Sequence, residues 1–247
     1  MKKKRELIYL VILVIIGIGI NYNYLDGFII KNFSNEEYIE VERVIDGDTV
    51  VVNGTSVRLL GINAPEKGEK YYAEAKNYTS SLVMDRSLRT ERKGKDLYGR
   101  ELAYLFYGNI NINSEIVKKG YANYYFPEGK DNYYDLFVNS WEDCIKRNEN
   151  LCEKSESLCA ECIVLKDFGY NQNVILYNKC LSDCNLEEWS IKDEGRKKFV
   201  FENFILISYA EAEISNKDFN ETYVWTKTGD TMFLRDNEGK LVLWEGY

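Results

Sequence analysis

Five charged residues in the first half of the chain have types and spacings that could bind a cation and an anion together. Asp46 and Asp48 are two residues apart, so on an extended strand both carboxylates can point at one cation. Arg58 lies among apolar strand residues and needs an anionic partner, which is either a structural carboxylate or a phosphate. Glu66 follows a proline in a loop, and Arg100 belongs to a turn. A hard cation, a carboxylate base and two guanidiniums would together activate water and neutralise growing negative charge.

Each of these features also has a plainer structural interpretation. Asp-Gly pairs commonly form simple turns, and residues 96–100 could be a solvated surface loop. The chain has no histidine, which excludes every mechanism built on imidazole and leaves carboxylates as the first candidates for acid–base chemistry. Its 247 residues, 45% of them hydrophobic, are enough for one large or two small domains.

The elements around these residues predict a closed five-stranded barrel with helices packed on it. Asn53-Gly54 is a strong hairpin signal, Asn113 or Ser114 is expected to cap a short helix, and Gly120 to end it. The expected strands cover 38–45, 49–52, 56–60, 87–92 and 101–107, and the expected helices cover 71–82, 113–120 and 133–145. This order suits an α+β OB-fold domain over residues 36–150.

The pattern changes in the second half of the chain. Short segments rich in Val, Phe, Ile and Tyr, among them 223–225, alternate with turn residues, and no helical periodicity of useful length is present. Seven or eight such strands predict an all-β, immunoglobulin-like sandwich over residues 163–247. Residues 151–162 are then expected to form a cysteine-containing linker.

The N-terminus predicts export. Basic residues 2–5 precede an uninterrupted apolar run from Leu7 to Ile20, which resembles a signal sequence and is short for a spanning helix. No Ala-x-Ala cleavage signal follows, and Tyr22 and Tyr24 could lie at a membrane interface. We therefore expect residues 1–30 to be a signal peptide or a hydrophobic anchor helix formed by residues 7–24. The rest of the chain would lie outside the cytoplasmic membrane, either anchored or secreted.

Six cysteines fall in one stretch of the chain, residues 144–184. The spacing of the last four also fits a tetrathiolate zinc site, whereas an exported location favours disulfides. A free thiol in the core is a further alternative for the first of them, and the pairing cannot be deduced from the sequence. The six are Cys144, Cys152, Cys159, Cys162, Cys180 and Cys184.

Five segments of the first half, in their order and spacing, resemble the thermonuclease, or staphylococcal nuclease-like, family. The resemblance covers roughly residues 38–150 and implies a calcium-dependent phosphodiesterase on an OB-fold, which cleaves DNA and RNA and leaves 3′-phosphate ends. The segments are Val-Ile-Asp-Gly-Asp-Thr (44–49), Arg-Leu-Leu-Gly-Ile (58–62), Ala-Pro-Glu (64–66), Glu-Ala (74–75) and Asp-x-Tyr-Gly-Arg-x-Leu-Ala (96–103).

The same resemblance implies one calcium ion per nuclease domain. By position, Asp48 would be its main carboxylate ligand, the Ala64 carbonyl a second ligand, and Asp46 would lie beside the ion. The family usually has Asp where this chain has Asn63. An amide oxygen can bind calcium but brings no charge, so we expect weaker metal affinity and retained activity.

The catalytic roles that the resemblance implies fall on three residues. Glu66 would orient and deprotonate the attacking water, while Arg58 and Arg100 would hold the phosphate and the charge of the transition state. Three tyrosines are candidates for contact with the nucleotide, namely Tyr98, Tyr124 and Tyr125.

The second half resembles the lamin-tail domain, an immunoglobulin-like sandwich. The pattern Leu186-x-x-Trp189-x-Ile191-x-Asp193 and residues 224–242 carry this resemblance, with Trp189 and Trp225 as expected core residues. It implies an accessory binding or positioning module whose ligand is unknown.

The leading hypothesis is therefore an exported nuclease of DNA and RNA with an accessory domain. The alternative is a non-catalytic nucleic-acid-binding or envelope-attachment protein. A formal charge of −8, most of it in residues 151–247, provides no broad basic face. Phosphate binding would therefore depend on the metal and on the placed arginines.

Overall fold

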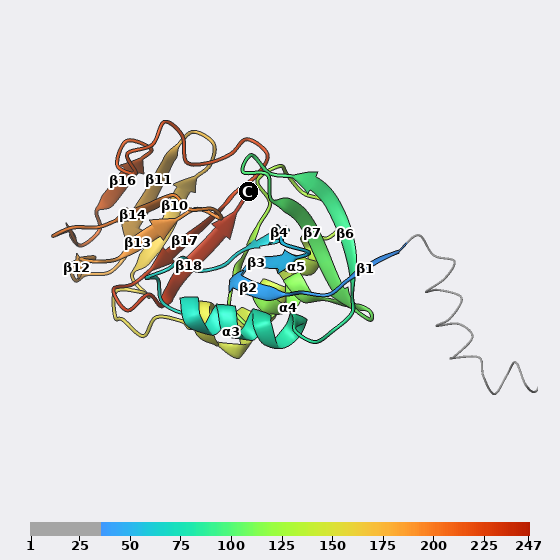
Figure 1. Cartoon of the computed structure of the whole chain (residues 1–247). Coiled ribbons are helices and arrows are strands. Elements are labelled where there is room, and N and C mark those ends of the chain that lie inside the picture. The colour runs from blue at the N-terminus through green and yellow to red at the C-terminus, as the bar shows by residue number, and fades with distance from the viewer. Residues whose placement is uncertain (1–35) are drawn as a thin grey trace, which may run out of the picture. The chain divides into compact units, whose positions relative to one another are not determined.

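The computed structural model describes residues 36–247 (Figure 1), so the predicted signal peptide or membrane anchor lies outside the described residues. Among the residues described, no helix has both the length and the apolar composition that a bilayer crossing requires.

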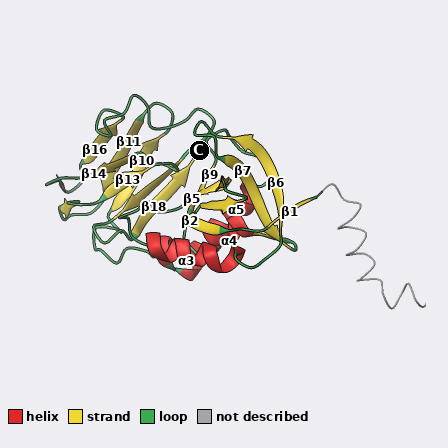
Figure 2. Ribbon diagram, in the orientation of Figure 1, coloured by secondary structure: helices red, strands yellow, loops and turns green. Residues whose placement is uncertain are grey.

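The first half of the described chain is a curled sheet with three α-helices, consistent with an OB-fold (Figure 2). Its main sheet has the strand order β6-β7-β4-β3-β2, with β8 on β7, and β4 runs parallel to β7. A separate two-stranded ladder joins β5 and β9. The strands are β1 (Glu37–Ile39), β2 (Arg43–Asp46), β3 (Thr49–Val52), β4 (Thr55–Leu59), β5 (Gly61–Asn63), β6 (Leu88–Lys95), β7 (Glu101–Tyr107), β8 (Ile110–Asn111) and β9 (Asn123–Tyr125).

The Asn53-Gly54 turn forms as predicted between β3 and β4. Both residues have positive φ, 49° and 72°, which is the backbone twist that a tight two-residue hairpin requires. The register that follows pairs Thr49 with Arg58, so the turn places Arg58 beside the loop that carries the two aspartates. A local turn signal thus fixes part of the site.

Three helices pack on the sheet: α3 (Tyr72–Val83), α4 (Ile112–Lys118) and α5 (Tyr134–Arg147). The cap of α4 differs from the prediction, because Asn111 accepts the Ser114 amide at 3.0 Å. Asn113 is instead fully buried and bonds to backbone groups of Leu60, Ala103 and Leu105. Gly120, with φ of 69°, ends the helix as expected.

The second half is built from short strands in three small sheets. Their orders are β10-β11-β16, β12-β15 and β14-β13-β17-β18. The strands are β10 (Ile163–Phe168), β11 (Asn173–Asn178), β12 (Cys184–Asn185), β13 (Ser190–Lys192), β14 (Lys198–Val200), β15 (Ile205–Leu206), β16 (Glu211–Ser215), β17 (Thr231–Arg235) and β18 (Leu241–Gly246); a single 3₁₀ turn, η1 (Asn150–Cys152), precedes them.

Residues 223–225 were expected to be a strand and are not one. The side-chain amide of Gln172 takes the place of a partner strand, since its Oε1 accepts the Val224 amide at 2.6 Å and its Nε2 donates to the Trp225 carbonyl at 2.8 Å. Trp225 is nevertheless buried, as is Trp189, so both predicted core tryptophans are confirmed.

Strand β17 joins the two halves through one hydrophobic cluster. Because successive strand residues face opposite sides, Met232 and Leu234 pack in the hydrophobic cluster of the second half while Phe233 packs on the first half. The Phe233 ring lies 5.2 Å from that of Trp141 in α5 and 6.2 Å from that of Tyr124. The two halves are therefore held together by core packing.

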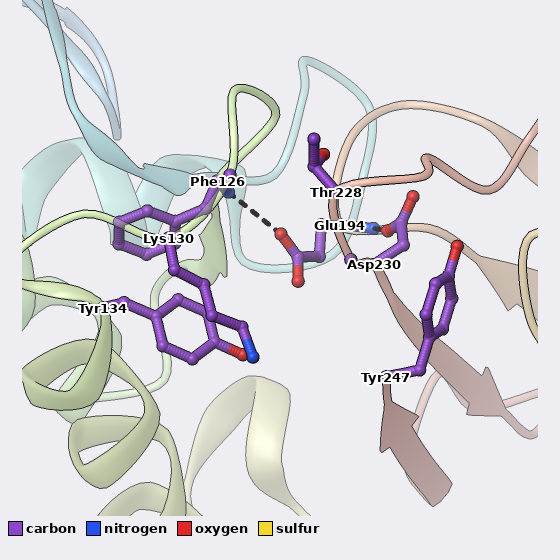
Figure 3. Close-up of a pocket in the computed structure, with 9 residues that line it drawn as sticks. Phe126, Lys130, Tyr134, Glu194, Thr228, Asp230 and Tyr247 are labelled. Atoms are coloured by element: carbon purple, nitrogen blue, oxygen red, sulfur yellow. Dashed lines mark hydrogen bonds between the residues drawn. The ribbon is translucent and has the colours of Figure 1, made fainter.

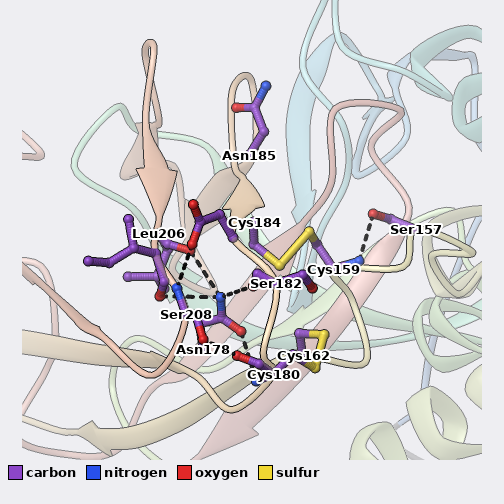
Figure 4. The surroundings of a disulfide bond; sticks show 12 residues. Ser157, Cys159, Cys162, Asn178, Cys180, Ser182, Cys184, Asn185, Leu206 and Ser208 are labelled. Carbon is purple, nitrogen blue, oxygen red and sulfur yellow. Dashed lines mark hydrogen bonds between the residues drawn. A yellow bond between two sulfur atoms is a disulfide. The ribbon is translucent and has the colours of Figure 1, made fainter.

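All six cysteines are paired in disulfides, which the structure favours over a zinc site and over a free core thiol. Cys144 is bonded to Cys152. The other two bonds tie the start of the second half to the segment around β12 (Figure 4), and they are Cys159–Cys184 and Cys162–Cys180.

Candidate active site

The loop that carries Asp46 and Asp48 packs against α3, which fixes its backbone at Gly47. A side chain at Gly47 would lie 2.6 Å from the Cβ of Ala64 and 2.9 Å from that of Ala75, so only glycine fits. The Thr79 hydroxyl donates to the Gly47 carbonyl at 2.7 Å. The helix thus fixes the backbone between the two carboxylates.

Asp48 is the anionic partner of Arg58 that the sequence required. Their side chains form an ion pair, and Asp48 and Arg58 are only 5% and 7% exposed. The second carboxylate oxygen of Asp48 accepts the Ala64 amide at 2.8 Å. The Nη atoms of Arg58 also donate to the carbonyls of Asp48 and Ile62, at 3.3 and 3.1 Å, so the guanidinium braces the aspartate loop and β5.

Asp46 lies beside this pair and is half-buried. Burial, followed by the negative charge of Asp48, raises the pKa of Asp46, and a nearby cation would relieve both effects. Within residues 36–247 no three carboxylate or thiol side chains are grouped so that they could hold a metal ion by themselves. The Ala64 carbonyl and solvent would therefore have to complete the oxygen shell of a calcium ion, and such a donor set fits this metal.

Asn63 is engaged at both ends of its amide. Its Oδ1 accepts from Arg58 at 3.3 Å, and its Nδ2 donates to the Gly195 carbonyl in the second half at 2.7 Å. An aspartate at this position would put a carboxylate oxygen against that carbonyl. The structure therefore gives Asn63 a bracing role beside the expected metal role.

Glu66, the expected base, meets a residue of the second half. Its Oε1 lies 2.7 Å from Nη2 of Arg196, which belongs to the loop between β13 and β14. The amide of Glu66 donates to Glu69 Oε2 at 2.8 Å, which orients the loop. The carboxylate is therefore held at the surface by a cation that is distant in the sequence.

Arg100 is held by its own turn. Asp96 accepts the amides of Tyr98 and Arg100, both at 2.9 Å, and the Nε of Arg100 at 2.7 Å. Burial opposes the charge of Asp96, but these hydrogen bonds outweigh it and lower the pKa of Asp96. The guanidinium also lies 5.6 Å from the centre of the Tyr98 ring, and Tyr98 is 84% exposed.

A cleft of about 390 Å³ collects residues from both halves of the chain. Of the expected site residues, Arg58, Asn63, Tyr98, Arg100 and Tyr125 line it. The expected base Glu66 and the expected metal-site residues Asp46, Asp48 and Ala64 are not among the residues that line it. Tyr124 does not line it either, because it is 1% exposed and packs in the core that includes Trp141. The second half contributes Asp193, Glu194, Gly195, Arg196, Lys197, Tyr223, Thr226, Gly229 and Asp230.

The loop of residues 193–197 docks on the first half through buried hydrogen bonds. The Asn123 side chain donates to the Glu194 carbonyl at 2.9 Å, and the Phe126 amide donates to Glu194 Oε2 at 2.9 Å (Figure 3). Asn123 and Asn63 are register partners in the β5–β9 ladder. The loop of residues 193–197 therefore contacts the first half at the end of the β5–β9 ladder.

Three buried carboxylates accompany this docking. Burial, and then the charge of Asp230, raises the pKa of Asp193 to about 7. Burial also raises the pKa of Glu194 to about 7, against the hydrogen bonds from Phe126 and Thr231. The pKa of Asp230 is raised as well, chiefly by burial. The interface consequently disfavours full ionisation of this cluster.

Sequence reasoning missed the residues that the loop contributes. Asp193 was noted only as part of a β-sandwich pattern, and no local signal relates Gly195 to Asn63, which lies 132 residues away. Contacts over such a distance follow from packing, here the packing of β17 on α5.

Comparisons with known proteins agree on one family. Residues 56–154 match the family described as staphylococcal nuclease homologue. The chain is 33% identical to a thermonuclease of Staphylococcus intermedius over 131 residues, which cover 48% of this chain and 77% of that protein. It is 29% identical over 130 residues to a thermonuclease of Staphylococcus hyicus, with coverage of 48% and 77%. A micrococcal nuclease of Shigella flexneri is 35% identical over 104 residues, with coverage of 37% and 60%.

Proposed function

The chain belongs to the family of staphylococcal nuclease homologues and is a nuclease, and we propose that it is a calcium-dependent enzyme that hydrolyses DNA and RNA to 3′-phosphate ends. One observation carries the proposal: Arg58 and Arg100, from different strands and turns, line the same cleft. Glu66 does not line this cleft itself, but it is ion-paired with Arg196, which does. Hydrolysis of a phosphodiester requires a base for the attacking water and cations for the growing charge, and Glu66 and the two arginines are the side chains that we assign to these roles.

In this mechanism Glu66 takes a proton from the attacking water. Its Oε1 is held by Arg196, so Oε2 is the oxygen available to the water. The water attacks phosphorus, the bond to the 5′-oxygen breaks, and the 5′-oxygen takes up a proton while the phosphate stays on the 3′-oxygen. The base contributes about two to four orders of magnitude in systems of this kind.

Arg58 and Arg100 bind the phosphate and the charge that grows on it. Arg100 holds Asp96 through Nε, which directs the other edge of its guanidinium to a phosphate oxygen. Asp48 and the Ala64 carbonyl would hold calcium, with Asp46 beside it. When bound there, the ion supplies further neutralisation of the phosphate charge.

Export and the accessory domain are part of the proposal. The basic and apolar N-terminal pattern supports an exported protein, either anchored by residues 7–24 or secreted. The three disulfides are consistent with an oxidising compartment. The strands of residues 163–246 support a lamin-tail-like sandwich whose own ligand is unidentified.

The test is a cleavage assay with the full chain on DNA and on RNA, in calcium and in a calcium chelator. Glu66→Gln keeps the shape of the side chain and should lower the rate at least 100-fold, whereas Glu187→Gln, an exposed change in the second half, should not. Release of product phosphate by a phosphomonoesterase specific for 3′ ends identifies the bond that is cut. Equal cleavage rates for wild type and Glu66→Gln would refute the role of Glu66 as the base. Binding of nucleic acid without any cleavage by the wild type would favour a binding module.

A further inference from the structure

The second half of the chain brings cations and an exposed aromatic ring to the cleft. Arg196 keeps 62% of its side chain exposed although it pairs with Glu66. The ammonium of Lys197 lies 3.5 Å from the centre of the Tyr223 ring, and Tyr223 is 56% exposed. All three residues line the cleft.

The first half lines the same cleft with a similar pair, in which the Arg100 guanidinium lies 5.6 Å from the centre of the exposed Tyr98 ring. Both walls thus combine a cation with an accessible aromatic face. Single nucleic-acid strands are held by this combination, because cations contact the phosphates and rings stack on the bases.

The acidic residues of the cleft do not cancel this character. Asp193 Oδ1 accepts the Lys197 amide at 2.9 Å. Asp230 accepts the amides of Glu194, Thr231 and Thr226 at 2.9–3.3 Å. These buried carboxylates face backbone donors, whereas the side chains of Arg196 and Tyr223 are open to solvent.

The wall is built into the fold. Four contacts between the loop and the first half fix it, from Asn63, Asn123, Phe126 and Glu66, at 2.7–2.9 Å. The Tyr124 hydroxyl adds a 2.8 Å hydrogen bond to Thr231 in β17.

We propose that Arg196, Lys197 and Tyr223 form a second wall of the substrate cleft, which binds the nucleic-acid strand beside the phosphate that is cut. Arg196 and Lys197 contact backbone phosphates, and Tyr223 stacks on a base. The proposal rests on the proposed function only in taking a nucleic-acid strand as the occupant. It makes the accessory half part of the substrate site of the nuclease.

The test measures binding of a fluorescent single-stranded oligonucleotide by anisotropy across a salt series. It uses the full chain with Glu66 intact, in a calcium chelator, so that cleavage does not interfere and the ion pair between Glu66 and Arg196 is kept. Replacing both Arg196 and Lys197 by Gln should lower the slope of log affinity against log salt by about 1.4, roughly 0.7 for each lost phosphate contact. Tyr223→Ala should weaken binding about five- to 100-fold with the slope unchanged.

Matched controls are Lys217→Gln and Tyr170→Ala, exposed residues of the second half that do not line the cleft. Thermal melting of every variant checks folding. Unchanged affinity and slope in the cleft variants would overturn the proposal. Tighter binding after Arg196→Gln would also overturn it, because Arg196 would then hinder binding of the nucleic-acid strand. If the wild-type chain binds through these residues but cuts neither DNA nor RNA when calcium is present, the wall is supported and the nuclease mechanism is refuted.

Discussion

Replacing Glu194 by Gln should destabilise the protein at pH 5 and stabilise it at pH 8. The carboxylate is buried, with Oε2 on the Phe126 amide and Oε1 on the Thr231 hydroxyl, at 2.9 and 2.7 Å. Burial raises its pKa from 4.5 to about 7. The folded state therefore keeps a proton that the unfolded chain releases as the pH rises above 4.5.

The raised pKa of Glu194 lowers the stability of the wild type progressively as the pH rises from about 4.5 to 7, and the loss is complete above that range. A shift of this size corresponds to about 3 kcal/mol of lost stability at pH 8. Gln avoids this penalty but has one carbonyl oxygen for two donors, which costs about 1 kcal/mol for the lost hydrogen bond. We therefore expect Glu194→Gln to be about 1 kcal/mol less stable than wild type at pH 5 and about 2 kcal/mol more stable at pH 8.

The assay is urea unfolding of the oxidised full chain at both pH values in a calcium chelator. Glu187→Gln, which changes an exposed carboxylate, is the matched control and should have little effect at either pH. If Glu194→Gln destabilises the protein equally at both pH values, the raised pKa of Glu194 does not govern the docking of the loop and the reasoning fails.

Three further predictions concern the shared core, the metal site and the disulfides. Phe233→Ala should cost about 3–5 kcal/mol in urea unfolding, because the ring fills the cluster between the two halves; a cost below 1 kcal/mol would mean that the halves are not packed as described. Asn63→Asp should lower the calcium concentration for half-maximal cleavage, since it adds a charged ligand, and should also weaken docking by opposing the Gly195 carbonyl. An unchanged calcium requirement would contradict the metal role. Replacing Cys162 and Cys180 together by Ser should lower the free energy of unfolding by about 3 kcal/mol, the value for a loop of this length. Peptide mapping of the wild-type protein without reductant should recover Cys162 bonded to Cys180, and recovery of another pairing would contradict the structure.

Much of the site follows from short sequence patterns. Asn53-Gly54 fixes a hairpin whose register sets Arg58 beside Thr49, next to the aspartate loop. The need of a strand arginine for an anion is also local chemistry, and the structure meets it with Asp48. These features depend on residues within about a dozen positions of one another, where backbone geometry alone limits the outcomes.

The pairing of the cysteines and the burial of Tyr124 could be determined only from the tertiary structure. Six thiols at these spacings suited disulfides or zinc, and only the approach of residues 159–162 to 180–184 chose between them. Tyr124 and Tyr125 are adjacent, and alternation along β9 sends Tyr124 into the core and leaves Tyr125 at the cleft. Which of two neighbours faces outward depends on what packs on each side of the strand.

The amino-acid sequence by itself determined the carboxylates, the arginines and the local strands and turns that carry them. Only the tertiary structure decided that the second half closes the cleft and brings Arg196 to Glu66. The physical basis of this arrangement is that β17 is buried on both of its faces, one in each half. This packing places the loop of residues 193–197 against Asn63 and Asn123. Such a contact depends on the complementarity of two distant surfaces, and no single segment of the chain contains that information.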